Sequence, residues 1–87
     1  MLSIEITEQD IQDAQPNNFA DPLARALNRT TGKEWRTEVY SHGVALANGR
    51  VWTADLSQDL SIDAGTTLAL VAFDAGEPFQ PRTATLA

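Results

Sequence analysis

Both ends of one helix can be placed directly from the sequence, at Asp21 and Gly32. Asp21 can accept hydrogen bonds from the first turn, and the Pro22 that follows suits the first helical position. Gly32 can adopt the left-handed conformation in which many helices end. Between these ends one stripe recurs at helical spacing, formed by Leu23, Ala26, Leu27 and Thr30. A single amphipathic helix cannot bury its own stripe, so the rest of the chain has to supply a second layer that covers it.

Alternation with a period of two predicts that this layer is a sheet. Leu2, Ile4 and Ile6 alternate with polar residues, as in a strand with one buried side. Residues 34–40 alternate in the same way. After them, Asn48-Gly49 stands between two β-rich segments and is typical of a two-residue hairpin turn.

We therefore predict an antiparallel meander with strands at 34–40, 43–47 and 50–55. Trp35 and Trp52 are expected to fill part of its core, since large aromatic side chains dominate the cores of small domains.

The remaining segments predict two more helices and a terminal strand. Thr7 can cap a short first helix, which ends before Pro16. A last helix at about 64–75 ends at Gly76, and the segment from Phe73 to Pro81 then serves as a structural connector to a strand in the final residues. The apolar positions expected to face the core in this last third are Leu60, Leu68, Val71 and Ala72.

The predicted fold is therefore one α+β domain over residues 1–87, in the order β-α-α-β-β-β-α-β. It has a small antiparallel sheet, made of a three-stranded meander and terminal strands, packed against two to three helices. An exposed edge of that sheet could pair with a second copy and give a homodimer.

The composition narrows the environment and the partners. The chain has no cysteine, so it has no disulfide and no thiolate metal site, and it lacks a signal peptide and a membrane-spanning run. We therefore expect a cytoplasmic protein that does not contact a membrane. Its net charge of −6 makes direct nucleic-acid binding unfavourable and favours a protein partner with a basic surface.

Acidic side chains near both ends of the chain are the candidate partner-binding residues. They are Glu8, Asp10, Asp13, Asp55, Asp59 and Asp63. The last three recur every four residues and would share a face on a helix, where they could hold a hard cation. The interspersed Ser57 and Ser61 favour a set of caps or a solvated face instead, and we predict no metal and no cofactor.

A basic group in the middle of the chain offers the alternative, a nucleic-acid face. It consists of Arg25, Arg29, Lys33 and Arg36, with Trp35 and Tyr40 nearby for stacking. Glu34 and Glu38 lie beside these bases, so pairing with the chain's own acids is the interpretation we favour.

We predict no enzymatic activity. The single histidine, His42, directly follows Ser41, and adjacent residues cannot face one another as a nucleophile and its base. We interpret His42 as part of a turn. The phosphate-binding, zinc-protease and nucleophile-elbow motifs are absent from the sequence as well.

Three short motifs together resemble a known pattern: Asp10-Ile11, Pro22-Leu23-Ala24-Arg25-Ala26-Leu27, and Phe73-Asp74-Ala75-Gly76 followed by Pro78 or Pro81. The pattern is that of a loose family of small uncharacterised proteins from phages, prophages and bacteria. Many members carry Cys at the position of Asp21, so this chain cannot use a thiol there. Members also usually carry a Pro before the last helix, where this chain has Ser57–Ser61. The resemblance implies a mobile-element origin and a compact α+β fold, and it brings no activity.

Two hypotheses about function follow. The first is a small acidic non-enzymatic protein, encoded by a phage or mobile element, that binds a host or phage protein. A sharper form is an anti-CRISPR inhibitor whose acidic surface occupies a nucleic-acid channel. The second is a small nucleic-acid-associated regulator that uses the basic group.

Overall fold

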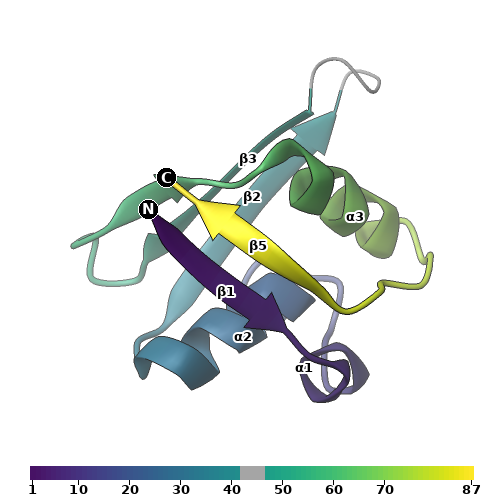
Figure 1. The fold of residues 1–87 in the computed structure, drawn as a ribbon, viewed down its shortest axis with the longest axis horizontal. Coiled ribbons are helices and arrows are strands. Elements are labelled where there is room, and N and C mark those ends of the chain that lie inside the picture. The colour runs from purple at the N-terminus through teal and green to yellow at the C-terminus, as the bar shows by residue number, and fades with distance from the viewer. Residues whose placement is uncertain (42–46) are drawn as a thin grey trace.

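The computed structural model describes residues 1–41 and 47–87 and confirms the α+β fold with the predicted element order (Figure 1). The elements are β1 (Leu2–Ile6), α1 (Glu8–Gln12), α2 (Pro22–Thr31), β2 (Trp35–Ser41), β3 (Ala47–Thr53), β4 (Asp59–Ser61), α3 (Ala64–Asp74) and β5 (Arg82–Leu86). Strands β2, β3 and β4 form an antiparallel meander, and β1 pairs with β5.

The two sheets meet just after β4. Ser61 and Ala87 exchange two backbone hydrogen bonds of 2.7 and 3.0 Å, and the Asp63 N–H donates to the Thr85 carbonyl at 3.1 Å. On the other side of the same segment, the Ile62 N–H donates to the Gly49 carbonyl at 2.9 Å. The chain after β4 therefore lies between β3 and β5, and it links the sheets into one strongly bent surface. In Figure 1 β1 and β5 cross in front of β2 and β3.

The hydrophobic core lies inside this bend, where α2 and α3 pack against the strands. Its largest fully buried apolar side chains are Trp35, Ile4, Ile6, Leu23, Leu27, Leu70, Leu86 and Val51. The buried Trp35 indole N–H donates to Thr31 Oγ1 at 2.8 Å, so its one polar group is satisfied. Trp35 therefore fills the core as predicted.

The helix ends follow the sequence signals. The Asp21 side chain accepts the Ala24 N–H at 2.8 Å, and Gly32 ends α2 with a φ of 73°. Thr7 caps α1, and α3 stops just before Gly76, as predicted. The stripe of α2 differs at one position, because Thr30 is exposed at the end of the helix.

The predicted turn at Asn48-Gly49 is wrong. Both residues lie within β3, where Asn48 pairs with Tyr40 and Gly49 with Val39. Strand β3 at Ala47–Thr53 overlaps the predicted strand 50–55, and the short β4 at Asp59–Ser61 lies beyond it. Residues 42–46, which include His42 and most of the predicted second strand, lie outside the described residues.

Gly49 has a packing role instead of a turn role. A Cβ at this position would lie 2.6 Å from Thr67 Oγ1, 3.0 Å from Ile62 Cδ1 and 3.1 Å from Val39 Cγ1. The missing side chain therefore lets α3 and the segment after β4 approach the strand closely.

Two further core predictions are wrong. Trp52 is only half-buried and lies on the side of the sheet away from the helices, because the buried Val51 and Thr53 alternate with it. In α3 the buried residues are Thr66, Thr67 and Leu70, whereas Leu68, Val71 and Ala72, which were expected to face the core, are only half-buried. Leu60, in β4, is also half-buried but packs against the core as expected. The predicted connector is confirmed, since Phe73 packs edge-on against Phe79 with ring centroids 6.3 Å apart.

Asp21 is a carboxylate inside the protein, with 3% of its surface exposed. One oxygen caps α2, and the other accepts the hydroxyl of Thr37 in β2. Burial raises its pKa to about 6 despite these hydrogen bonds, and the nearby Asp74 adds to the rise. When Asp21 is protonated it can donate to Thr37, whose hydroxyl also lies 3.5 Å from the Asn18 carbonyl.

Replacement of Asp21 by Asn should stabilise the protein at pH 7.5. Folding raises the pKa of Asp21 from 3.8 to about 6. The protonated carboxyl therefore stabilises the fold fully below pH 3.8, and this contribution is lost as the pH rises through 6. Asn keeps the cap without a buried charge. We expect a gain of roughly 1–3 kcal/mol at pH 7.5 that disappears near pH 3.5, measured by urea unfolding at both pH values.

Asp63→Asn is the matched control. Asp63 also caps a helix, but hydrogen bonds from Thr85 and Thr66 outweigh its burial and lower its pKa. Its contribution is therefore present above pH 3.8 and lost below, so this variant should be destabilised at pH 7.5. Equal changes in the free energy of unfolding for both variants would contradict the opposite pKa shifts of Asp21 and Asp63.

Replacement of Gly49 by Ala should destabilise the fold by about 1–3 kcal/mol, because the new methyl group would enter a packed interface. Gly65→Ala is the control. There the nearest atom to a new Cβ is the mobile guanidinium tip of Arg82 at 2.7 Å, and Ala suits a helix better than Gly. We expect the second variant to match or slightly exceed the wild type in urea unfolding. Two equal losses would argue against close packing at Gly49.

Candidate functional site

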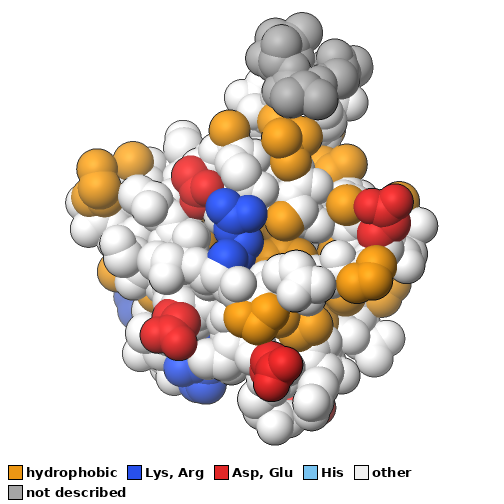
Figure 2. Space-filling view, turned by 45° about the vertical axis from the view of Figure 1, so that its right-hand side comes forward, with side chains coloured by type: hydrophobic (Ala, Val, Ile, Leu, Met, Phe, Trp, Pro, Cys, Tyr) orange, Lys and Arg blue, Asp and Glu red, His pale blue; other side chains and the backbone are white. Residues whose placement is uncertain are grey.

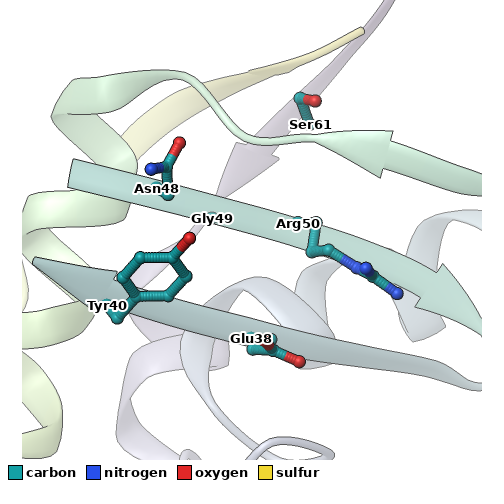
Figure 3. Close-up of a pocket in the computed structure, with 6 residues that line it drawn as sticks. All are labelled: Glu38, Tyr40, Asn48, Gly49, Arg50 and Ser61. Atoms are coloured by element: carbon teal, nitrogen blue, oxygen red, sulfur yellow. The ribbon is translucent and has the colours of Figure 1, made fainter. Parts of the chain in front are cut away.

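One side of the β2–β3–β4 sheet is not covered by any helix within residues 1–41 and 47–87. We call it the outer face, and it is formed by Arg36, Glu38, Tyr40, Asn48, Arg50, Trp52, Asp59 and Ser61. The register arranges these residues in rows across the strands. Figure 3 shows the side chains of Glu38, Tyr40, Asn48 and Arg50 on the near side of their strands, with the helices behind.

Arginine and aromatic side chains are held against one another on this face. The Arg50 guanidinium lies 5.0 Å from the centre of the Trp52 ring and 3.4 Å from the Asp59 carboxylate. At the edge of the sheet, the Arg36 guanidinium lies 5.6 Å from the centre of the Phe19 ring. These cation–π contacts and ion pairs limit the rotamers of both arginines, so the face is largely ordered before a ligand binds.

A hollow of about 260 Å³ lies in the outer face. Its lining residues are Glu38, Tyr40, Asn48, Gly49, Arg50 and Ser61. Tyr40 is the largest of them and is 49% exposed. Pockets for small molecules usually hold about 300–1,000 Å³ and enclose most of the ligand, so this hollow suits one or two side chains of a larger partner better.

The acidic residues of α1 hold the protein's own structure together. The Asp10 carboxylate, which is 5% exposed, accepts the Thr7 N–H at 2.9 Å and two Arg29 N–H groups at 3.0 and 2.9 Å. Burial alone would raise the pKa of Asp10, but the hydrogen bonds from Arg29 and Thr7 outweigh it and lower the pKa. Asp13, which is exposed, lies 3.5 Å from Arg25. Glu8 is exposed as well and lies beside a second hollow of about 210 Å³.

The three aspartates would have shared a face only on one helix, and they lie on different elements instead. Asp55 is in the turn after β3, where hydrogen bonds from Ser57 and Thr53 lower its pKa to about 2. Asp59 is in β4, and Asp63 caps α3. In residues 1–41 and 47–87, no group of three or more potential metal-ligating side chains lies together.

Three of the four residues of the basic group are paired with acids of the same chain, the interpretation that we favoured. Arg29 binds Asp10, Arg25 lies near Asp13, and Arg36 lies 3.9 Å from Glu34. Lys33 Nζ lies 3.5 Å from the Ser57 hydroxyl. Trp35 is fully buried and cannot stack on a base. The four bases therefore do not form the exposed basic and aromatic surface that nucleic-acid binding requires.

Sequence reasoning did not identify the outer face. Its members Arg50 and Trp52 lie on one side of β3, and the buried Val51 and Thr53 alternate with them on the other side. That alternation could have placed Trp52 outside, but the assumed turn at Asn48-Gly49 and the expectation that tryptophan is buried concealed it.

Comparison with protein-family models, with curated proteins and with solved structures finds no match to this chain. In the part of the chain that the structure describes, no helix is long and apolar enough to cross a membrane. Arguments about function therefore depend on the geometry of the described residues.

Replacement of Arg29 by Ala should lower the melting temperature by roughly 5 °C or more, because it leaves the buried Asp10 without its cation. The Arg29 interaction lowers the pKa of Asp10 below 3.8, so the loss should shrink progressively as the pH falls from 3.8 through that lowered pKa and Asp10 becomes protonated. Arg25→Ala removes an exposed pair and should change the melting temperature by less than about 3 °C. Thermal melts at pH 7 and pH 3 test both statements, and equal losses would contradict the distinct role of Arg29.

Proposed function

We propose that this protein is a non-enzymatic protein-binding domain and that its outer face is the docking site. The observation that carries the proposal is the cluster of Tyr40, Arg50 and Trp52 on a sheet surface that no described helix covers. In a small domain with few large side chains, the placement of two aromatic rings outside the core requires an explanation other than stability.

The residue types support a protein partner. Tryptophan, tyrosine and arginine are the residues most enriched among those that dominate the binding energy of protein interfaces. Here Tyr40 and Arg50 line a hollow of about 260 Å³, which could accept a side chain of the partner, and Arg50 also lies over the Trp52 ring. The ion pair and the cation–π contact of Arg50 reduce the entropy lost when the partner binds.

The balance of charge on the outer face favours protein over nucleic acid. Arg36 and Arg50 are offset there by Glu38 and Asp59, in a chain whose net charge is −6. Without a positive excess the face would not attract phosphate. The shallow hollow likewise supports docking rather than catalysis, because it does not enclose a substrate.

Docking through the acidic residues receives less support. Asp10, Asp13, Asp59 and Asp63 are each engaged by an arginine of the same chain, which lowers the negative potential that they could offer to a basic partner. A mobile-element origin, a host or phage partner and an anti-CRISPR role stay predictions from the sequence and its resemblance.

Substitutions on the outer face should remove binding without unfolding the domain. Immobilised wild-type protein should retain a partner from a lysate of cells that naturally express it. Trp52→Ala and Tyr40→Ala should each weaken that retention about 10-fold or more, which corresponds to about 1.4 kcal/mol. Leu56→Ala, at an exposed site on the turn between β3 and β4, is the control and should bind like the wild type. Circular dichroism checks that all three variants fold.

Equal retention of the same proteins by every variant would contradict the proposal that the outer face is the docking site. A fluorescence anisotropy titration with single-stranded DNA or RNA in about 50 mM salt tests the alternative. Saturable binding that is lost in Arg50→Ala would show that the outer face recognises nucleic acid instead.

A further inference from the structure

The outward side of α3 is apolar, which is unusual for a helix at a protein surface. No charged residue occurs from Ala64 to Phe73, so the helix is free of charge between Asp63 and Asp74. Surface helices normally place polar and charged side chains toward water. Figure 2 shows hydrophobic side chains gathered on the side of the molecule where α3 lies.

The outward stripe can be traced residue by residue. Thr66, Thr67 and Leu70 of α3 are buried against the strands, so the opposite side of the helix faces out. That side is formed by Ala64, Leu68, Val71, Ala72 and Ala75, of which the first and last are exposed and the others half-buried. The small alanines would allow another helix to approach closely, with Leu68 and Val71 at the centre of the contact.

The two ends of α3 differ in charge. At the first turn the Arg82 guanidinium lies 3.6 Å from Asp63 and donates to the Gly65 carbonyl at 3.1 Å, so that end is neutral apart from the positive pole of the helix. At the other end Asp74 has no basic side chain in the last turn, and Glu77 follows closely. Burial raises the pKa of Asp74, and its carboxylate lies close enough to Asp21 to raise the pKa of that residue as well.

We propose that α3 of one molecule packs against α3 of a second copy in antiparallel orientation. This pairing places Asp74 and Glu77 of each copy near Arg82 and the positive helix end of the other. A parallel pairing would instead bring four carboxylates together at one end. The antiparallel surface is complementary to itself, which is the condition for an interface with two-fold symmetry.

The absence of charge along the stripe favours a second copy as the occupant. Two molecules that each carry a net charge of −6 repel one another over most of their surfaces, but not where the contact surface has no charge. With 11 residues the helix is only about 16 Å long, so the interface falls in the small class and the dimer should be weak. The inference goes beyond the proposed docking function and uses the opposite side of the β2–β3 pair.

Sedimentation equilibrium from about 10 µM to 1 mM tests the association, a range chosen to span that of small interfaces. The wild type should shift from monomer to dimer. Leu68→Glu, which brings buried carboxylates to the interface, should remain monomeric. Leu56→Glu is the matched control, with the same charge change at a residue that is 79% exposed on the turn between β3 and β4, far from α3 in Figure 1. It should dimerise like the wild type. A wild type that is monomeric throughout, or a Leu68→Glu variant that dimerises equally well, would overturn the proposal.

Cross-linking tests the orientation and does not depend on the Leu68 variant folding. The chain has no cysteine, so Ala64→Cys and Ala75→Cys each introduce a single thiol at an exposed position. One of the two variants carries a tag that changes its size, and the two variants are mixed and treated with a short bismaleimide. An antiparallel pair should give mainly dimers in which Ala64→Cys of one molecule is cross-linked to Ala75→Cys of the other. Mainly same-site products would overturn the antiparallel arrangement.

Neither test involves the outer face, so a failure of the α3 pairing leaves the docking proposal unaffected. Retention of a partner by Leu68→Glu would show that docking and dimerisation are independent.

Discussion

Asp63 holds together the three parts of the fold. Its side chain accepts the Thr66 N–H at the start of α3 and the Thr85 N–H of β5, and its backbone N–H donates to the Thr85 carbonyl. Its carbonyl accepts both the backbone N–H and the hydroxyl of Thr67. One residue thus fixes the start of the last helix, the approach of the terminal strand and the bend between the sheets. The position of α3 over β2 and β3, and with it the free side of that sheet, depends on this junction.

Much of the fold could be predicted because local signals agreed with the tertiary structure. The caps of α2 at Asp21 and Gly32 and the alternation in β1 lie where the sequence places them. The signal at Asn48-Gly49 misled because glycine there serves close packing against Thr67 rather than a turn. In α3 two threonines face the core and Leu68 faces out, so side-chain polarity alone indicated the wrong side of the helix.

The candidate site was harder to predict for a related reason. Charge and composition directed attention to acidic residues, but most of these are neutralised by arginines that are distant in sequence, such as Asp10 by Arg29. Such pairs depend on the tertiary structure and cannot be read from spacing along the chain. The outer face, in contrast, combines residues of three strands whose register was assigned incorrectly. In this protein the ionic residues chiefly maintain the structure, and the uncharged and aromatic surfaces are the better candidates for recognition.

The opposite placement of α3 and the outer face has a consequence for how such a domain would work. A pair joined through its last helices would present two identical outer faces pointing away from one another. Such an arrangement favours partners that are themselves repeated, because the second contact forms at a high effective concentration once the first has formed. With two contacts, the affinity of the whole assembly for its target can be high although the affinity of each single contact is low. A modest affinity at Trp52 and a weak helix pair could together give avid but readily reversible capture of a multivalent target.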